Sequence, residues 1–221
     1  MITVHHLNNS RSQRILWLLE ELGVPYEVRR YQRNAKTMLA PPELRAVHPL
    51  GKSPVITDDG RVVAETGAIV EYLVERYGNG RLIPPSGTEE RLRYTYWLHF
   101  AEGSAMPPLV MTLIFKEMPK AVPGLIRPIA RMISDQVQQR FLRPQIAAQL
   151  DLMEAELGGA AWFAGAAFSA ADVQMSFPVE AAAMRAGLGQ RAKLGTWLQR
   201  IHARPAYQAA LARGGSYAYA G

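Results

Sequence analysis

The segment 48–73 holds residues whose types and spacing suit the binding of a small charged ligand. They fall into one group before an apolar run and another at a helix start: Lys52, Ser53, Pro54 and Val55, then Glu65 and Thr66. A proline directly before an apolar strand can leave the preceding backbone groups unpaired, and an acidic residue at a helix start lies beside free N–H groups. Together the two groups offer partners for both ends of a charged, peptide-like ligand.

Strands and helices joined by short connections are predicted around these residues. Residues 2–7 show a strand pattern, and residues 9–23 show a polar cap, an apolar-periodic helix and a terminal glycine. From Val55 onward a strand, a turn at 58–60 and another helix follow. The order strand, helix, strand, hairpin and helix predicts an α/β unit.

Beyond this unit the strand pattern ends. Glycines and prolines cluster at 78–87 and predict a linker at 81–87, which separates an N-terminal domain, 1–80, from an all-helical domain, 88–221. Inside the helical domain, the prolines of 106–128 predict a kinked or split helix pair with a loop near 119–124.

Length and composition are those of an ordinary globular protein. At 221 residues, 48% hydrophobic and 20% charged, the chain is long enough for one or two domains with a substantial core. No apolar run approaches the roughly 18 residues that a membrane helix needs, and the N-terminus shows no signal-peptide pattern. We therefore expect a cytoplasmic protein that does not insert into membranes.

The sequence contains no cysteine. Structural disulfides, thiolate metal sites and a Cys-x-x-Cys redox centre are therefore excluded, and any reactive sulfur must come from a ligand. The histidines show no metal-ligand spacing, and no metal is expected: His5, His6, His48, His99 and His202.

Much of the net charge of +6 lies in one stretch. Between positions 116 and 143, six basic and two acidic residues give a net charge of +4. A basic face can attract nucleic acid or an anionic membrane surface, but no nucleic-acid motif accompanies this one. We interpret the stretch as solvated helix faces and expect no nucleic-acid partner.

The block 48–55, the helix start at 64–73 and the helix at 9–23 resemble the glutathione-binding half of the cytosolic glutathione transferases. Downstream, 168–172 matches the helix-capping signature of that family, so the resemblance covers almost the whole chain. The nearest likeness is to bacterial serine-type, theta- or beta-like lineages. The resemblance implies a thioredoxin-like domain with a mixed four-stranded sheet, an all-α C-terminal domain, glutathione as co-substrate and a homodimer.

This resemblance places the thiolate-stabilising group in the turn before the first helix. A thiol with a pKa of about 8.5 is mostly protonated at neutral pH, so the thiolate needs a hydrogen-bond donor and free helix N–H groups. Ser10 is our first candidate for the donor. Asn9 is the second, because the position of the family's catalytic hydroxyl falls on it. As an alternative, Ser10 only caps the helix.

The resemblance also assigns partners to the two ends of glutathione. Lys52, in one block with Ser53, would reach the glycine carboxylate or stabilise the loop. Pro54, in the cis form, would expose the backbone of Val55 to the cysteinyl unit.

At the other end, Glu65 would bind the γ-glutamyl ammonium, and Thr66 would bind the carboxylate beside it. The family usually has serine where Thr66 stands. An alternative role for Glu65 is that of a first-turn acid favoured by the helix dipole.

Ser169 and Asp172 are spaced for a capping box, which is a structural role. The pocket for the electrophile is expected between the domains, although aromatic and methionine side chains at helical spacing are more often part of a core. Its candidate lining residues are Tyr94, Trp97, Leu98, Ala101, Met106 and Met111.

These observations predict a glutathione transferase that conjugates the glutathione thiolate to hydrophobic electrophiles, in a detoxification role. Glutathione peroxidase activity is a related outcome that would use the same thiolate. The alternative is a non-catalytic glutathione-binding or regulatory protein on the same scaffold, because a fold does not settle a function.

Overall fold

The computed structural model describes residues 1–37 and 39–220. Its first part alternates strands and helices: β1 (Ile2–Leu7), α1 (Ser12–Leu22), β2 (Tyr26–Tyr31), α2 (Pro42–Val47), β3 (Val55–Asp58), β4 (Arg61–Ala64) and α3 (Thr66–Tyr77). The second part is built from helices: α4 (Glu89–Phe100), α5 (Met106–Glu117), α6 (Arg127–Val137), α7 (Arg143–Gly159), α8 (Ala170–Arg185), α9 (Ala192–His202) and α10 (Pro205–Gly214). The predicted fold class, α/β followed by all-α, is therefore confirmed.

The four strands form one mixed sheet in the order β2-β1-β3-β4. β1 runs parallel to β2 and antiparallel to β3, and β3 runs antiparallel to β4. Val55 is opposite His5 on one side and Ala64 on the other. The end of β1, the start of β3 and the end of β4 therefore meet at one edge of the sheet, where the connections to α1, from α2 and to α3 also lie.

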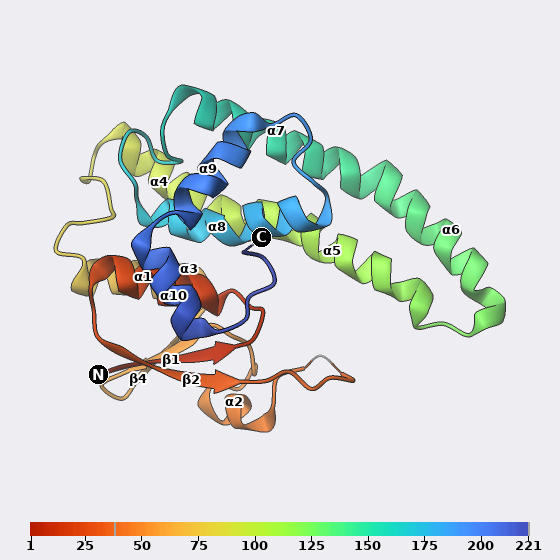
Figure 1. The fold of residues 1–221 in the computed structure, drawn as a ribbon, viewed down its shortest axis with the longest axis horizontal. Helices are drawn as coiled ribbons and strands as arrows, with labels where there is room; N and C mark the ends of the chain where they lie inside the picture. The colour runs from red at the N-terminus through yellow and green to blue at the C-terminus, as the bar shows by residue number, and fades with distance from the viewer. Residues whose placement is uncertain (38, 221) are drawn as a thin grey trace.

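Helices cover both faces of this sheet. Figure 1 shows α1, α3 and α10 on one side and α2 on the other. On the α2 side, Leu44 packs with Leu7 and Tyr31. α1 ends at Gly23, whose positive φ of 65° suits the left-handed cap that glycine adopts without a steric penalty.

Prolines follow irregular turns in the long helices of the second part. A five-residue π-helical segment, Ala101–Ala105, precedes α5, which carries Pro107 and Pro108 in its first turn. The flanking residues Phe100, Ala105 and Met106 keep right-handed helical dihedrals, so α4, the π-helical segment and α5 form one continuous helix, and the wide turn lies directly before the two residues that lack an N–H. The predicted loop of the split helix pair is present: 3-10 turns at Met118–Lys120 and Gly124–Ile126 connect α5 to α6.

A second π-helical segment, Gln138–Leu142, lies between α6 and α7, and Pro144 follows in the first turn of α7. Helix α7 buries apolar side chains at helical spacing, including Ile146, Leu150 and Met153. This face holds the helix against the rest of the second part.

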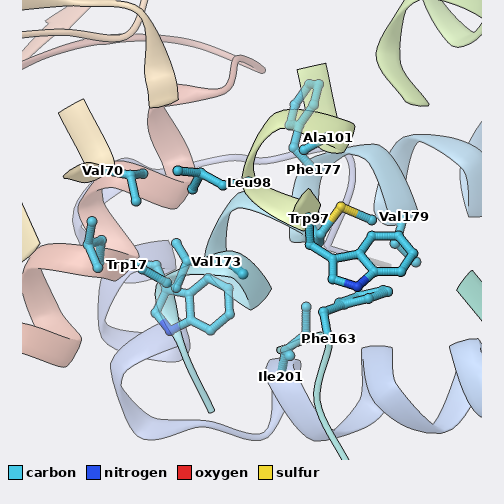
Figure 2. Close-up of a cluster of buried hydrophobic side chains, with 14 of the residues drawn as sticks. Trp17, Val70, Trp97, Leu98, Ala101, Phe163, Val173, Phe177, Val179 and Ile201 are labelled. Carbon is cyan, nitrogen blue, oxygen red and sulfur yellow. The ribbon is translucent and has the colours of Figure 1, made fainter. Parts of the chain in front are cut away.

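One continuous core joins the two parts of the chain. Figure 2 shows Trp17 from α1 and Val70 from α3 beside Leu98 from α4 and Val173 from α8. Trp97 packs against Phe163, with ring centroids 4.8 Å apart. Because side chains from both parts are buried together, α1 and α3 are held in fixed positions relative to α4 and α8.

The predicted capping box is present at the start of α8. The carboxylate of Asp172 accepts hydrogen bonds from the Ser169 backbone N–H at 3.0 Å and from the Ser169 hydroxyl at 3.2 Å. It also accepts from the Phe163 backbone N–H at 3.0 Å and from Nε1 of Trp197 at 3.1 Å. Burial raises the pKa of Asp172 more than these donors lower it, and the resulting pKa is about 6. The role of Asp172 is structural.

Candidate functional site

A cavity of about 200 Å³ opens at the sheet edge where the three connections meet. Its lining residues are Arg11, His48, Leu50, Lys52, Ser53, Pro54, Ala64, Glu65, Thr66 and Glu102. The structure thus brings together five of the predicted ligand-binding residues: Lys52, Ser53, Pro54, Glu65 and Thr66.

The peptide bond between Ser53 and Pro54 is cis, as the family resemblance predicts. The Ser53 hydroxyl donates to the backbone oxygen of His5 at 2.9 Å and accepts from the backbone N–H of Leu7 at 3.3 Å. These bonds fix Ser53 to the end of β1. Val55 is only 1% exposed, lies between β1 and β4, and does not line the cavity.

The start of α3 is open to the cavity. Glu65 is exposed and adopts a φ of 69°, while Thr66 is buried and begins the helix. Non-glycine residues with positive φ are uncommon and gather at functional sites. The first N–H groups of α3 have no acceptor within the helix and so are suited to a carboxylate.

At the start of α1, the polar side chains form hydrogen bonds with one another. Ser10 is 4% exposed, and its hydroxyl lies 2.7 Å from the hydroxyl of Ser12 and accepts from the Ser12 backbone N–H at 3.2 Å. The Ser12 hydroxyl in turn lies 2.9 Å from Nδ1 of His6. Ser10 does not line the cavity, but its hydroxyl donates to Oγ of Ser53, a lining residue, at 3.5 Å.

His6 holds the hydroxyls of Ser10 and Ser12 in place through its contact with Ser12. Burial, and then the charge of Arg30, lower the pKa of His6 to about 4. The ring is therefore neutral at neutral pH. A neutral imidazole carries one acceptor nitrogen, which can accept a hydrogen bond from the Ser12 hydroxyl.

Asn9, the second predicted donor, is turned toward the C-terminal segment. It is exposed, has a φ of 49°, and its side-chain oxygen accepts from the backbone N–H of Ala218 at 2.9 Å. Asn9 does not line the cavity either.

Arg11 and Glu102 line the cavity, although neither was predicted as a site residue. Nε of Arg11 lies 3.1 Å from Oε1 of Glu102, which stands on the π-helical segment and also binds the buried Arg14. Burial by itself would raise the pKa of Glu102, but Arg14 and then Arg11 outweigh it and hold the pKa below its usual range. Glu102 is therefore ionised and holds the guanidinium of Arg11 at the cavity.

One sequence signal for Arg11 exists. A cation at a helix start faces the positive end of the helix dipole, so its presence needs a local reason. No comparable signal exists for Glu102, because it is 91 residues away in the sequence.

Most of the predicted pocket residues lie elsewhere. Five of them are buried in the core: Tyr94, Trp97, Leu98, Ala101 and Met106. Their helical spacing marks the face with which α4 and the start of α5 pack against the core. Met111 is half-buried on α5, and none of the six lines the cavity.

The cavity therefore presents charges of both signs. Arg11 and Lys52 supply cations, and Glu65 and Glu102 supply carboxylates. Such a set matches a small ligand with both carboxylate and ammonium groups. Among residues 1–37 and 39–220, no group of three or more histidine or acidic side chains is arranged to hold a metal ion.

Comparisons with known proteins identify the family. Residues 10–76 match the family model described as the glutathione S-transferase N-terminal domain, and residues 113–205 match the model of the C-terminal domain. Glutathione S-transferase 3 of Schizosaccharomyces pombe is 38% identical over 208 residues, which are 93% of this chain and 85% of that protein. Glutathione S-transferase 1 of Saccharomyces cerevisiae is 31% identical over 219 residues, 95% of this chain and 93% of that protein.

A solved structure gives the same result. A glutathione S-transferase from Actinobacillus pleuropneumoniae superposes with a TM-score of 0.80 at 31% sequence identity, covering 99% of this chain and 95% of that chain. The agreement extends over both parts of the fold, so the chain belongs to the glutathione S-transferase family.

Proposed function

We propose that the chain is a glutathione transferase that binds glutathione in the cavity and adds its thiolate to a hydrophobic electrophile. The observation that carries the proposal is the convergence of Lys52, Ser53, Glu65 and Thr66 on one cavity at the sheet edge. Glutathione carries two carboxylates and one ammonium group, and the cavity offers a partner of opposite charge to each kind of group.

The lining residues suggest how glutathione is oriented. Glu65 binds the γ-glutamyl ammonium, and the Thr66 hydroxyl with the first N–H groups of α3 binds the adjacent carboxylate. Lys52 binds the glycine carboxylate. We assign the backbone contact with the cysteinyl unit to Ser53 in place of Val55, because Ser53 lines the cavity and Val55 lies between two strands.

Three side chains are candidates for stabilising the thiolate: Ser10, Asn9 and Arg11. We favour Arg11, since it lines the cavity, whereas Asn9 is bonded to the C-terminal segment and Ser10 is bonded to Ser12 and meets the cavity only through Ser53. A charge-assisted hydrogen bond of about 1.5–3 kcal/mol would lower the thiol pKa by roughly one to two units. That shift is enough to populate the thiolate at neutral pH.

The electrophile would approach from the open side of the cavity. Leu50 lines the cavity, is 60% exposed and offers an apolar surface to the electrophile. Met111 remains a proposed contact with the electrophile. The same thiolate can also attack the peroxide bond of an organic hydroperoxide, so we retain peroxidase activity as part of the proposal.

Several broader features belong to the same proposal. Family membership favours a homodimer, a cytoplasmic location and a role in detoxification. The short connection 78–88 favours a division into 1–80 and 88–221 with a linker at 81–87. Among the described residues, no helix has both the length and the apolar character needed to cross a membrane.

The test is retention on immobilised glutathione followed by a conjugation assay with chlorodinitrobenzene. Wild type is expected to be retained and to show turnover. Arg11→Ala is expected to be retained with reduced turnover, while Arg93→Ala, which changes an exposed arginine on α4, serves as the matched control. Retention of wild type without turnover would contradict the transferase assignment and favour a binding protein.

A further inference from the structure

Another cavity, of about 320 Å³, lies in the helical part of the chain. It is bounded by α5, the π-helical segment Gln138–Leu142, the start of α7, and the end of α8 with the connection that follows it. Its lining residues are Thr112, Gln138, Arg143, Ile146, Ala147, Leu150, Arg185, Ala186, Gly187 and Arg191. It shares none of them with the cavity at the sheet edge, so the two cavities are separate sites.

Positive charge gathers at this cavity. Three arginines line it, and none of the ten lining residues is acidic. Arg191 is neutralised by Asp151, because its Nη2 lies 2.8 Å from Oδ1 of that carboxylate. Among residues 1–37 and 39–220, neither Arg143 nor Arg185 pairs with an acidic side chain. The cavity therefore presents two positive charges that the fold does not neutralise.

Arg185 is held in place by neutral groups. Its Nη1 donates to the backbone oxygen of Leu109 at 3.2 Å, and its Nη2 donates to the hydroxyl of Tyr219 at 2.6 Å. A guanidinium carries five N–H donors, so Arg185 keeps donors for a ligand. Arg143 is exposed and forms no hydrogen bond within the described part of the chain. Both guanidinium groups can therefore bind an anion without breaking an ion pair.

The inner lining of the cavity is apolar. Ile146 and Leu150 lie one turn apart on α7 and are only 5% and 2% exposed. Ala147 and Ala186 add small apolar side chains. Ligand sites commonly combine such an apolar lining with a few polar groups that orient the ligand. The expected ligand therefore carries an anionic group on an apolar body.

We propose that this cavity binds an organic phosphate, a phosphate monoester with a compact apolar group. The planar fork of arginine donates two parallel hydrogen bonds to phosphate oxygens. A phosphate monoester carries nearly two negative charges at neutral pH, which matches the two arginines without an acidic partner, whereas a carboxylate carries one. Arg143 and Arg185 would bind the phosphate, and Ile146 and Leu150 would contact the apolar group. The inference does not depend on the proposed transferase activity.

The test is isothermal titration calorimetry of the full chain with 1-naphthyl phosphate, which wild type is expected to bind at one site per chain. 1-Naphthoate and 1-naphthol should each bind about tenfold more weakly or worse, since charge-assisted hydrogen bonds to the arginines are lost. Inorganic phosphate should also bind about tenfold more weakly or worse, because it buries no apolar surface. Saturating glutathione should leave the binding of 1-naphthyl phosphate unchanged.

Arg143→Gln tests the assignment of the phosphate group. The variant should raise the dissociation constant for 1-naphthyl phosphate about tenfold, the loss expected for one charge-assisted hydrogen bond. Arg140→Gln is the matched control, because Arg140 is exposed on the preceding π-helical segment and does not line the cavity. It should bind 1-naphthyl phosphate as wild type does. Thermal unfolding followed by circular dichroism reports that each variant is folded.

Three outcomes would overturn the proposal. The first is that wild type does not bind 1-naphthyl phosphate at millimolar concentration. The second is that 1-naphthoate binds as tightly as 1-naphthyl phosphate, which would remove the match between two charges and a phosphate. The third is that Arg143→Gln binds as wild type does or that glutathione displaces the ligand, either of which would place the phosphate outside this cavity.

Discussion

Helices α1 and α3 both begin at the ligand edge of the sheet, but only α3 begins open. At α3, Glu65 and Thr66 line the cavity beside unpaired backbone N–H groups. At α1, the hydroxyl of Ser10 is bonded to that of Ser12, and Asn9 holds the C-terminal segment. The polar residues before α3 are therefore available to a ligand, whereas those before α1 hold the fold together.

This difference shows that a polar residue at a helix start does not by itself indicate a ligand site. Serine and asparagine at such positions satisfy backbone groups of the protein itself in most helices. At α1 the side chain that reaches the cavity is the longer one of Arg11, which Glu102 holds from the opposite part of the chain. Variants at the start of α1 and at the start of α3 should therefore have different effects.

The largest effect is expected from His6, which anchors the α1 network. Its folded pKa of about 4 lies below the ordinary value of 6.5, so the unfolded chain binds a proton first as pH falls. The contribution of His6 to the free energy of unfolding is therefore present above pH 6.5 and is lost toward pH 4, by up to about 3 kcal/mol. Urea unfolding across this range should show a shallower pH dependence for His6→Gln than for wild type.

The exposed His99 provides the control for that measurement. His99→Gln should retain the wild-type pH dependence. An equal slope in His6→Gln and wild type would mean that His6 is not held neutral by the fold.

Arg11→Ala tests the cation at the α1 start. Loss of a charge-assisted hydrogen bond of about 1.5–3 kcal/mol should lower kcat/KM at neutral pH by about ten- to a hundredfold. Because the change acts on the thiol pKa, the deficit should shrink as pH is raised. A deficit that is the same at all pH values would point to lost binding instead.

Glu65→Gln tests the open start of α3. Since the carboxylate is proposed to bind the ammonium in both ground state and transition state, KM for glutathione should rise about tenfold with kcat little changed. Glu71→Gln changes an exposed acid on the same helix and should leave KM unaltered. A fall in kcat at unchanged KM would contradict the assignment.

Ser10→Ala is expected to have the smallest effect. Removing one hydroxyl from the α1 network should lower the free energy of unfolding by about 1 kcal/mol, as for a typical hydrogen bond. Steady-state kinetics should show kcat/KM near that of wild type. A large loss of kcat in a variant of normal stability would restore Ser10 as the thiolate donor.

The fold was predictable from the sequence because its signals are local. The strand at 2–7, the helix ending at Gly23 and the capping box of Ser169 and Asp172 each depend on residues close together in the chain. The split of the helices near 119–124 follows from the chemistry of proline. The lineage within the family stays a prediction.

The site was predictable only where one segment supplies it. Lys52, Ser53, Pro54, Glu65 and Thr66 lie within 15 consecutive positions and line one cavity. Arg11 and Glu102 meet across 91 residues through the packing of α1 against the π-helical segment, and no local pattern encodes that contact.

Aromatic spacing misleads for a related reason. Tyr94, Trp97 and Leu98 show the periodicity of an apolar face, and the structure buries that face in the core shared by both parts of the chain. Periodicity identifies which side of a helix is covered. It does not say whether protein or ligand covers it.

The most direct test of the α1–α3 contrast is the pKa of the thiol of bound glutathione, followed by the ultraviolet absorbance of the thiolate. Our account predicts that this pKa rises by about one to two units in Arg11→Ala and stays at the wild-type value in Ser10→Ala. A pKa that rises in Ser10→Ala and is unchanged in Arg11→Ala would contradict it.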